Sequence, residues 1–356
     1  MFSFRDRHIE ITNEQLYEDN VYFKKENGGS FGMSTIQLDD DSVLVSFLLK
    51  GGSAEKAGIR LGAEILKWNG QDAKKAYLVT EWSDYPFTTE ADRQFNQGRF
   101  MTRAPVGKRI VIEYRNITGE QDSQATMTAV DDQFATLKQT KIKLTKEDPP
   151  IISEIINGQY GYFKINYFLP SKKFPKPALL LVNQIHEFEK KEIKHLIIDV
   201  RDNPGGDDGL VTEIAGHFVN EERFYEYASY YNRFTQAFEI NRMETYTIQP
   251  RQPYFAGDII ILINNRTVSS GEGLPMALKG LPNVMIVGFT PTNGSFGVVS
   301  SPILVNMPGG YTIQLPDGRS LNKDKNIQGD VDRYGQGGVT PDIRIPLNAE
   351  TSKPSI

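Results

Sequence analysis

Hydrophobic residues in the second half of the chain form two short continuous runs, and a polar turn and a helix-like segment follow each run. The runs are His195–Val200 and Ile259–Ile263. Runs of this length without alternation predict strands that are buried on both faces of a sheet. The helices are expected at Leu210–Val219 and Leu274–Leu278. Strands that alternate with helices predict an α/β domain, in which ligands bind at the carboxyl ends of parallel strands.

The first half of the chain has shorter segments with strand-like patterns and turn residues between them. Strands are expected at Ser42–Leu49, Ile59–Gly70, Lys108–Tyr114 and Ser123–Ala129. A polar stretch that ends in a double proline at Pro150 predicts a linker. The expected organisation is an N-terminal segment at 1–27 that packs on the α/β core, a β-rich domain at 28–132, a linker at 133–150 and the α/β domain at 151–356.

Composition excludes several classes of function. The chain has 356 residues, a formal net charge of −5 and no cysteine. Disulfides, thiolate nucleophiles and cysteine metal sites are therefore excluded, and without a long basic run no nucleic acid partner is expected. No apolar run reaches the length of a transmembrane helix, so no membrane span is expected. The segment Met1–His8 contains no signal-peptide core and begins abruptly, so we expect that a leader has been removed.

Ser269 follows the second apolar run and is open to two interpretations. It lies three residues before Glu272, at the start of the expected helix. Ser-x-x-Glu is the pattern of a capping box, in which the serine hydroxyl binds a free amide of the first helical turn and the glutamate reaches back. Alternatively, a serine on a tight strand-to-helix turn is exposed as a nucleophile, and the amide of Ser270 stabilises an oxyanion.

A glycine-rich turn, Arg201–Gly209, follows the first apolar run. It directs backbone amides to the carboxyl end of a strand, which is also what an ordinary βα turn does. Its aspartates, Asp202, Asp207 and Asp208, lack the alternating spacing of an EF-hand loop. No metal site is therefore expected here.

Part of the β-rich domain resembles a PDZ domain. The resemblance rests on Ser-Ala-Glu-Lys-Ala-Gly at 53–58, followed by Leu-Gly-Ala-Glu-Ile-Leu at 61–66. PDZ domains bind an extended peptide, often a free C-terminus, by adding it as a strand beside a glycine-containing loop. The resemblance implies that Ser34–Ile36 is the docking strand. The implied substrate-binding residues are Phe31, Gly32, Met33 and Ser34.

Three motifs in order, behind the PDZ-like module, resemble the tail-specific (C-terminal-processing) and tricorn-core serine proteases. They are Asp-Val-Arg-Asp-Asn-Pro-Gly-Gly at 199–206, Ser-Ser-Gly-Glu at 269–272 and Gly-Val-Thr-Pro-Asp at 338–342. The resemblance implies an α/β protease domain of crotonase- and ClpP-like ββα units with an inserted PDZ domain. It also implies that Ser269 is the nucleophile, with an oxyanion hole made of the Ser270 amide and one from Gly205 or Gly206.

The chain departs from the tail-specific branch at the catalytic base. That branch uses a lysine in Thr-x-Gly-Lys-Gly, whereas Ser295 stands at the lysine position of Thr-Asn-Gly-Ser-Phe at 292–296. The tricorn-like branch uses a histidine in a short segment before the PDZ module, and Phe-Arg-Asp-Arg-His at 4–8 resembles it. His8 is therefore the implied base. The acid is expected just before the third motif, where only Asp330 and Asp332 occur; Asp332 is our choice.

The implied activity is hydrolysis of protein or peptide substrates through an acyl-enzyme, without a cofactor or metal, and with PDZ-assisted recognition of substrate C-termini. The alternative is a protein of the same fold that binds a ligand or peptide without cleaving it. A homo-oligomer is compatible with the sequence. By the habit of the family, we expect an exported protein of the periplasm or cell envelope.

Overall fold

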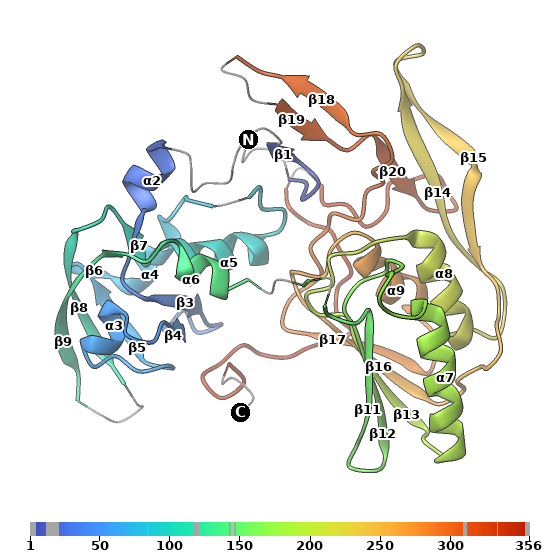
Figure 1. The fold of residues 1–356 in the computed structure, drawn as a ribbon, viewed down its shortest axis with the longest axis horizontal. Helices are drawn as coiled ribbons and strands as arrows, with labels where there is room; N and C mark the ends of the chain where they lie inside the picture. The colour runs from blue at the N-terminus through green and yellow to red at the C-terminus, as the bar shows by residue number, and fades with distance from the viewer. Residues whose placement is uncertain are drawn as a thin grey trace. The chain divides into compact units, whose positions relative to one another are not determined.

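A computed structural model describes residues 5–11, 21–83, 85–116, 121–141, 144–145, 147–308, 312–332 and 334–352 of the chain. They form two compact units (Figure 1). The α/β unit comprises Met1–Glu10, Leu144–Pro308 and Thr312–Ile345. The β-rich unit comprises Ile11–Lys143, Gly309–Tyr311 and Pro346–Ile356. The segment up to Glu10 therefore belongs to the α/β unit, although the β-rich unit separates the two in sequence.

The α/β unit is built on a six-stranded sheet that is parallel except at one edge. β11 pairs antiparallel with β12, and every other pair in the sheet is parallel. The spatial order is β11 (Ile151–Ile156), β12 (Tyr160–Ile165), β13 (His195–Asp199), β16 (Asp258–Ile263), β17 (Val284–Gly288) and β21 (Ile343–Arg344). Both predicted apolar runs are confirmed as central strands, β13 and β16.

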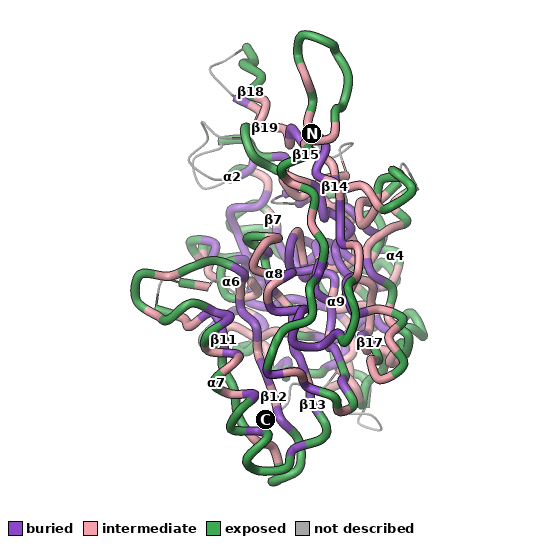
Figure 2. Tube along the Cα trace, turned by 90° about the vertical axis from the view of Figure 1, so that its right-hand side faces the viewer, coloured by how far each residue is buried: buried purple, intermediate pink, exposed green. Residues whose placement is uncertain are grey.

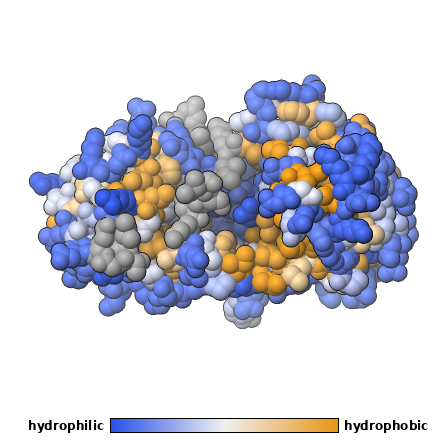
Figure 3. Space-filling view, turned by 90° about the horizontal axis from the view of Figure 1, so that it is seen from below, coloured by the Kyte–Doolittle hydropathy of each residue, from blue (hydrophilic) through white to orange (hydrophobic). Residues whose placement is uncertain are grey.

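Helices cover one face of this sheet. They are α7 (Pro177–Lys190), α8 (Asp208–Ala215), which a short 3-10 turn at Gly216–Phe218 continues, and α9 (Ser270–Leu278). The side chains of alternate strand residues, such as Phe163 and Ile198, are buried in the same core as Leu181 of α7, and Figure 2 shows buried backbone along α9. Burial of this apolar surface is the main force that holds the unit together. On the opposite face Ile260 and Met285 remain 39% and 42% exposed, and hydrophobic residues reach the molecular surface in patches (Figure 3).

Two smaller sheets complete the α/β unit. One has the order β15 (Ala237–Ile248), β14 (Arg223–Asn232) and β20 (Gly318–Leu321). The other joins β18 (Ile303–Asn306) and β19 (Thr312–Leu315) to β1 (Glu10–Ile11). Strand β14 carries a register shift between Phe224 and Glu226. Such a bulge redirects side chains.

The β-rich unit has a five-stranded antiparallel sheet and a small three-stranded one. The large sheet has the order β3 (Met33–Gln37), β4 (Val43–Leu48), β5 (Glu64–Trp68), β8 (Arg109–Arg115) and β9 (Ser123–Thr128), with β6 (Gln71–Asp72) beside β5. The small sheet joins β10 (Val130–Asp131), β2 (Gly29–Ser30) and β7 (Arg103–Ala104). The helices are α2 (Val21–Asn27), α3 (Ser53–Lys56), α4 (Ala73–Leu78), α5 (Glu90–Phe100) and α6 (Ala135–Gln139).

The boundaries of the β-rich unit differ from the expected ones. Phe23 of α2 packs with Phe100, Phe134 and Leu137 in a separate buried cluster. Part of the expected N-terminal segment and part of the expected linker therefore belong to this unit. Their polar composition concealed the few large side chains that anchor them.

The expected peptide-binding groove of the PDZ-like part is closed. Gly98 of α5 lies directly against the edge strand β3, where its carbonyl oxygen accepts the hydroxyl of Thr35 at 3.1 Å. Phe31, Met33 and Ser34 are buried. An incoming strand needs free backbone groups along an exposed edge, and α5 covers that edge.

The amides of the glycine-containing loop, which would bind the carboxylate of a peptide's C-terminus, already have hydrogen-bond partners. The amide of Phe31 donates to the carbonyl of Thr102 at 3.1 Å, and the amide of Gly32 donates to the hydroxyl of Ser30 at 2.9 Å. The assignment of Phe31, Gly32, Met33 and Ser34 to substrate binding stays a prediction, and in this conformation these residues are engaged within the unit.

We expect Gly98→Ala to destabilise the β-rich unit by about 1–3 kcal/mol, as overpacking does. A Cβ at this position would lie 2.0 Å from the carbonyl oxygen of Thr35. Trp68 and Trp82 both lie in this unit, so urea unfolding followed by tryptophan fluorescence measures the change. An unchanged midpoint would mean that α5 stands away from β3 in solution and leaves the groove open.

No helix in the described part of the chain is long and apolar enough to cross a membrane.

Candidate active site

Asn203 and two glycines shape the turn that follows β13. The side-chain amide of Asn203 donates to the carbonyl of Ile165 at 2.9 Å, and its side-chain oxygen accepts the amide of Gly205 at 2.8 Å. The φ angles of Gly205 and Gly206 are 104° and 148°. A Cβ at position 206 would lie 2.2 Å from the carbonyl oxygen of Phe168, so only glycine fits there. The turn therefore presents bare backbone at the carboxyl end of β13.

Ser269 lies on a strained turn between β16 and α9. Its φ and ψ are 55° and −136°, a conformation that costs a non-glycine residue on the order of 1–3 kcal/mol. A strained serine between a strand and a helix is typical of a nucleophile whose hydroxyl has to be exposed. The Ser269 amide donates to the carbonyl of Ser295 at 2.9 Å. In the described residues its hydroxyl has no hydrogen-bond partner.

The capping-box interpretation of this turn is wrong. Ser269 caps no amide of α9, and Glu272 does not reach back to it. Instead, the buried carboxylate of Glu272 accepts the hydroxyl of Thr292 and the amides of Gly294 and Ser295, the latter two at 2.8 and 2.9 Å. Burial raises the pKa of Glu272 to about 8, against the opposing effect of these bonds. Glu272 thus holds the loop whose carbonyl fixes the Ser269 amide, a role that the sequence pattern did not reveal.

Two backbone amides beside Ser269 are available to an oxyanion. Ser270 is the first residue of α9, so its amide has no acceptor within the helix. A Cβ on Gly205 would lie 3.0 Å from that amide, so the glycine turn and the helix start are adjacent. The Gly205 carbonyl accepts the amide of Phe168, and the Asp207 amide donates to the carbonyl of Phe168. Because both neighbours of Gly206 face Phe168, the amide of Gly206 itself points away from Phe168. Because Asn203 occupies the Gly205 amide, the structure favours Gly206 over Gly205.

His8 lies close to the Ser295 loop. The neighbouring Arg7 amide donates to the Ser295 hydroxyl at 2.9 Å, and the Ser295 carbonyl accepts the Ser269 amide. The Nδ1 of His8 lies 2.9 Å from Oδ1 of Asp6, which leaves Nε2 as the nitrogen that can act as a base. No hydrogen bond joins His8 to the Ser269 hydroxyl in the described residues. Catalytic hydrogen bonds in ligand-free enzymes are often long and tighten with substrate.

Carboxylates raise the pKa of His8. Burial alone lowers it, but the hydrogen bond to Asp6 and the negative charges of Asp6, Asp330 and Glu272 outweigh that effect. Asp330 and the imidazole both border Gly297: a Cβ there would lie 3.7 Å from each Asp330 carboxylate oxygen and 3.8 Å from Nδ1 of His8. These charges stabilise the imidazolium that a general base becomes.

The structure gives the two candidates for the acid, Asp332 and Asp330, different surroundings. Asp332 is exposed, and its Oδ1 accepts the amides of Tyr334 and Gln336 within a local turn. Asp330, two residues earlier, is the carboxylate that lies near His8, and burial raises its pKa to about 6. Asp6, which the sequence did not single out, makes the direct contact to the imidazole.

We expect Asp330→Asn to move the acidic limb of the pH–rate profile to lower pH. A base acts only when unprotonated, so activity rises as the pH passes upward through the raised pKa of His8. Removing one negative charge lowers that pKa. The measurement is kcat/KM for a peptide substrate across the pH range. Asp332→Asn is the matched control, and an equal shift in both variants would contradict the assignment.

The other three histidines have other environments. His186 and His195 are exposed and lie 3.1 Å from Glu189 and 3.2 Å from Asp258. His217 is buried, with its Nδ1 2.9 Å from the carbonyl of Pro253. Hence His8 is the histidine that the structure brings to the neighbourhood of Ser269.

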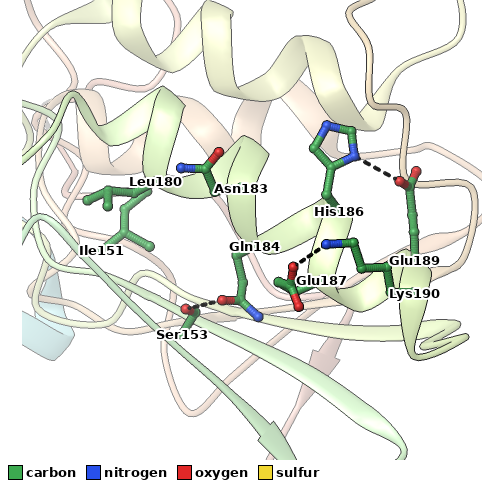
Figure 4. A pocket seen from close by; sticks show the side chains of 9 residues that line it. All are labelled: Ile151, Ser153, Leu180, Asn183, Gln184, His186, Glu187, Glu189 and Lys190. Atoms are coloured by element: carbon green, nitrogen blue, oxygen red, sulfur yellow. Dashed lines mark hydrogen bonds and ion pairs between the residues drawn. The ribbon is translucent and has the colours of Figure 1, made fainter.

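A surface cavity of about 570 Å³ lies elsewhere, between α7 and β11 (Figure 4). Most of its polar side chains pair with one another, for example Ser153 with Gln184 at 2.9 Å and Lys190 with Glu187 at 2.6 Å. Such paired groups provide no nucleophile, and the cavity is separate from the Ser269 site.

Similarity to known proteins agrees with this arrangement. Residues 159–345 match the model of peptidase family S41, and residues 20–79 match that of the PDZ domain. The chain is 24% identical over 329 residues to "Carboxy-terminal processing protease CtpB" of Bacillus subtilis, which covers 85% of this chain and 57% of that protein. It is 23% identical over 312 residues to the chloroplastic "Carboxyl-terminal-processing peptidase 3" of Arabidopsis thaliana, covering 85% and 50%. The chain thus spans about half the length of these relatives.

Solved structures agree at the level of the fold. "Structure of mature CPAF complexed with lactacystin" matches with a TM-score of 0.68 at 14% identity and covers 98% of this chain and 83% of that chain. At this identity the likeness concerns the fold alone. The S41 family model, in contrast, matches more than half of the chain and includes both Ser269 and the glycine turn. The chain therefore belongs to peptidase family S41.

Proposed function

We propose that this protein is a serine endopeptidase with Ser269 as its nucleophile. The observation that carries the proposal is the strained Ser269 turn, whose hydroxyl is left without a partner beside the amides of Ser270 and Gly206. A strained conformation that does not serve to cap the helix needs another reason, and nucleophilic catalysis supplies one. Membership of a peptidase family supports the same function.

The proposed reaction has two stages. Nε2 of His8 takes the proton of the Ser269 hydroxyl as the oxygen attacks the scissile carbonyl, while Asp6 holds the imidazole by its Nδ1–H. The developing oxyanion accepts hydrogen bonds from the amides of Ser270 and Gly206. His8 then passes its proton to the leaving amine. Water, activated by the same imidazole, hydrolyses the acyl-enzyme and frees Ser269.

We further propose that substrates are cut near their C-termini, as the names of the two relatives indicate for those proteins. Because α5 covers β3 in the β-rich unit, capture of a C-terminus there requires α5 to move. Equal binding of a peptide acid and its amide would argue against carboxylate capture by that unit.

Labelling with a fluorophosphonate probe tests the proposed function. We expect one modified residue, identified as Ser269 by peptide mass spectrometry, because only an activated serine reacts rapidly with this probe. Ser269→Ala and heat-denatured protein are the controls. If the native protein stays unlabelled, or if another serine is modified, the protein is a non-catalytic binder of the same fold and the proposal fails.

A further inference from the structure

Asp208 lies beside the proposed nucleophile but has no role in the proposed reaction. It is the first residue of α8, two residues after Gly206. Its carboxylate accepts the hydroxyl of Tyr225 at 3.0 Å and interacts with the hydroxyl of Ser270, the residue after Ser269. The residue as a whole is half-buried. Burial raises the pKa of Asp208 to about 6.

Asp208 acts electrostatically on a second carboxylate, that of Glu226. Glu226 follows Tyr225 at the bulge of β14, and it is only 1% exposed. Its Oε2 has no hydrogen-bond partner in the described part of the chain. Burial, and next the charge of Asp208, raise the pKa of Glu226 to about 8. An orphaned buried oxygen of this kind costs on the order of 1–3 kcal/mol unless a partner arrives.

Two other buried carboxylates of this protein have cationic partners, and a third, Glu272, is held by a hydroxyl and two amides. Asp199 pairs with Arg201 at 2.6 Å, and Asp132 pairs with Arg103 at 2.9 Å. In contrast, among the described residues no lysine or arginine forms an ion pair with Asp208 or Glu226. No group of three histidine, aspartate or glutamate side chains in the described residues is arranged to hold a metal ion. Oε2 of Glu226 differs from these oxygens in having no donor of any kind, and the cationic side chain of a substrate would supply both a donor and a positive charge.

We propose that Asp208, assisted by Glu226, binds the lysine or arginine side chain of the substrate residue that precedes the scissile bond. The inference rests on the proposed function. The carbonyl carbon of that substrate residue becomes bonded to Ser269, so its side chain starts next to the nucleophile. Asp208 is within reach of this position because it contacts Ser270 and follows the Gly206 amide.

Two matched peptides test the proposal. They differ only at the residue before the scissile bond, which is lysine in one and norleucine, of similar length but uncharged, in the other. We expect kcat/KM to be at least about tenfold higher for lysine, since hydrogen bonds to a charged group are the strong ones. In Asp208→Asn the ratio should fall to near one, and in Glu226→Gln it should fall in part.

Asp207→Asn is the control variant. Asp207 is exposed and caps α8 through the amide of Leu210, and asparagine caps equally well, so the lysine preference should persist. A wild-type ratio near one, or an unchanged ratio in Asp208→Asn, would overturn the inference. If the wild-type protein shows no lysine preference but Ser269 is still labelled by the fluorophosphonate, only this inference fails and the proposed peptidase function stands. If Ser269 is not labelled either, the inference and the proposed peptidase function both fail.

Discussion

Ser269→Ala should lower kcat for peptide hydrolysis by at least about 10⁴-fold, because it removes the atom that forms the acyl-enzyme. The same change should alter the free energy of unfolding by no more than about 0.5 kcal/mol. The Ser269 hydroxyl caps no helix amide, so its loss leaves no buried donor or acceptor unpaired. A capping serine, in contrast, would cost about 0.5–2 kcal/mol on replacement by alanine.

Turnover of an unstructured protein substrate and urea unfolding measure the two effects. Ser301→Ala, at an exposed serine of the same unit, is the matched control and should change neither quantity. Undiminished turnover by Ser269→Ala would refute the nucleophile assignment. A large loss of stability would instead mean that the side chain has a structural role.

His8→Ala should lower kcat by about 10³-fold or more, because a serine hydroxyl is a weak nucleophile without a base to take its proton. The residual rate should also lose the acidic limb that His8 produces. Since the pKa of His8 is raised, that limb should lie above pH 6.5 in the wild type. This expectation requires that His8 belongs to the same unit as Ser269. The hydrogen bond from the Arg7 amide to the Ser295 hydroxyl supports that placement in the α/β unit.

The rate of fluorophosphonate labelling measures the base independently of substrate binding. It should slow in His8→Ala as turnover does. His186→Ala, at an exposed histidine on α7, serves as the control. Full activity of His8→Ala would exclude a catalytic role for this histidine.

The strands of the α/β unit were predictable because local hydrophobicity decides them. The run at 195–200 became β13 (His195–Asp199), and the run at 259–263 became β16 (Asp258–Ile263). An apolar run of this length gains most free energy when both of its faces are buried. The helix expected at 210–219 is α8 (Asp208–Ala215), shifted towards its N-terminus, because Asp207 caps it by accepting the Leu210 amide.

The choice between a cap and a nucleophile was not predictable from the local pattern. Ser-x-x-Glu fits a capping box, yet Glu272 bonds to the loop at 292–295. A contact across 20 residues or more leaves no trace in four-residue spacing. For the same reason Asp330 and Asp332 looked equivalent in sequence, although one borders Gly297 and the other lies in an exposed turn.

The sequence by itself therefore determined the protease-like motifs, the central strands and the turns at their carboxyl ends. These depend on hydrophobic runs and on glycines at positions where a side chain does not fit. Tertiary structure alone decided which groups meet at the site: His8 and Asp6 beside the Ser295 loop, and Asp208 beside Ser270. It also decided that α5 closes the edge of β3. Each of these contacts joins segments far apart in the chain, where long-range packing and burial outweigh local preference.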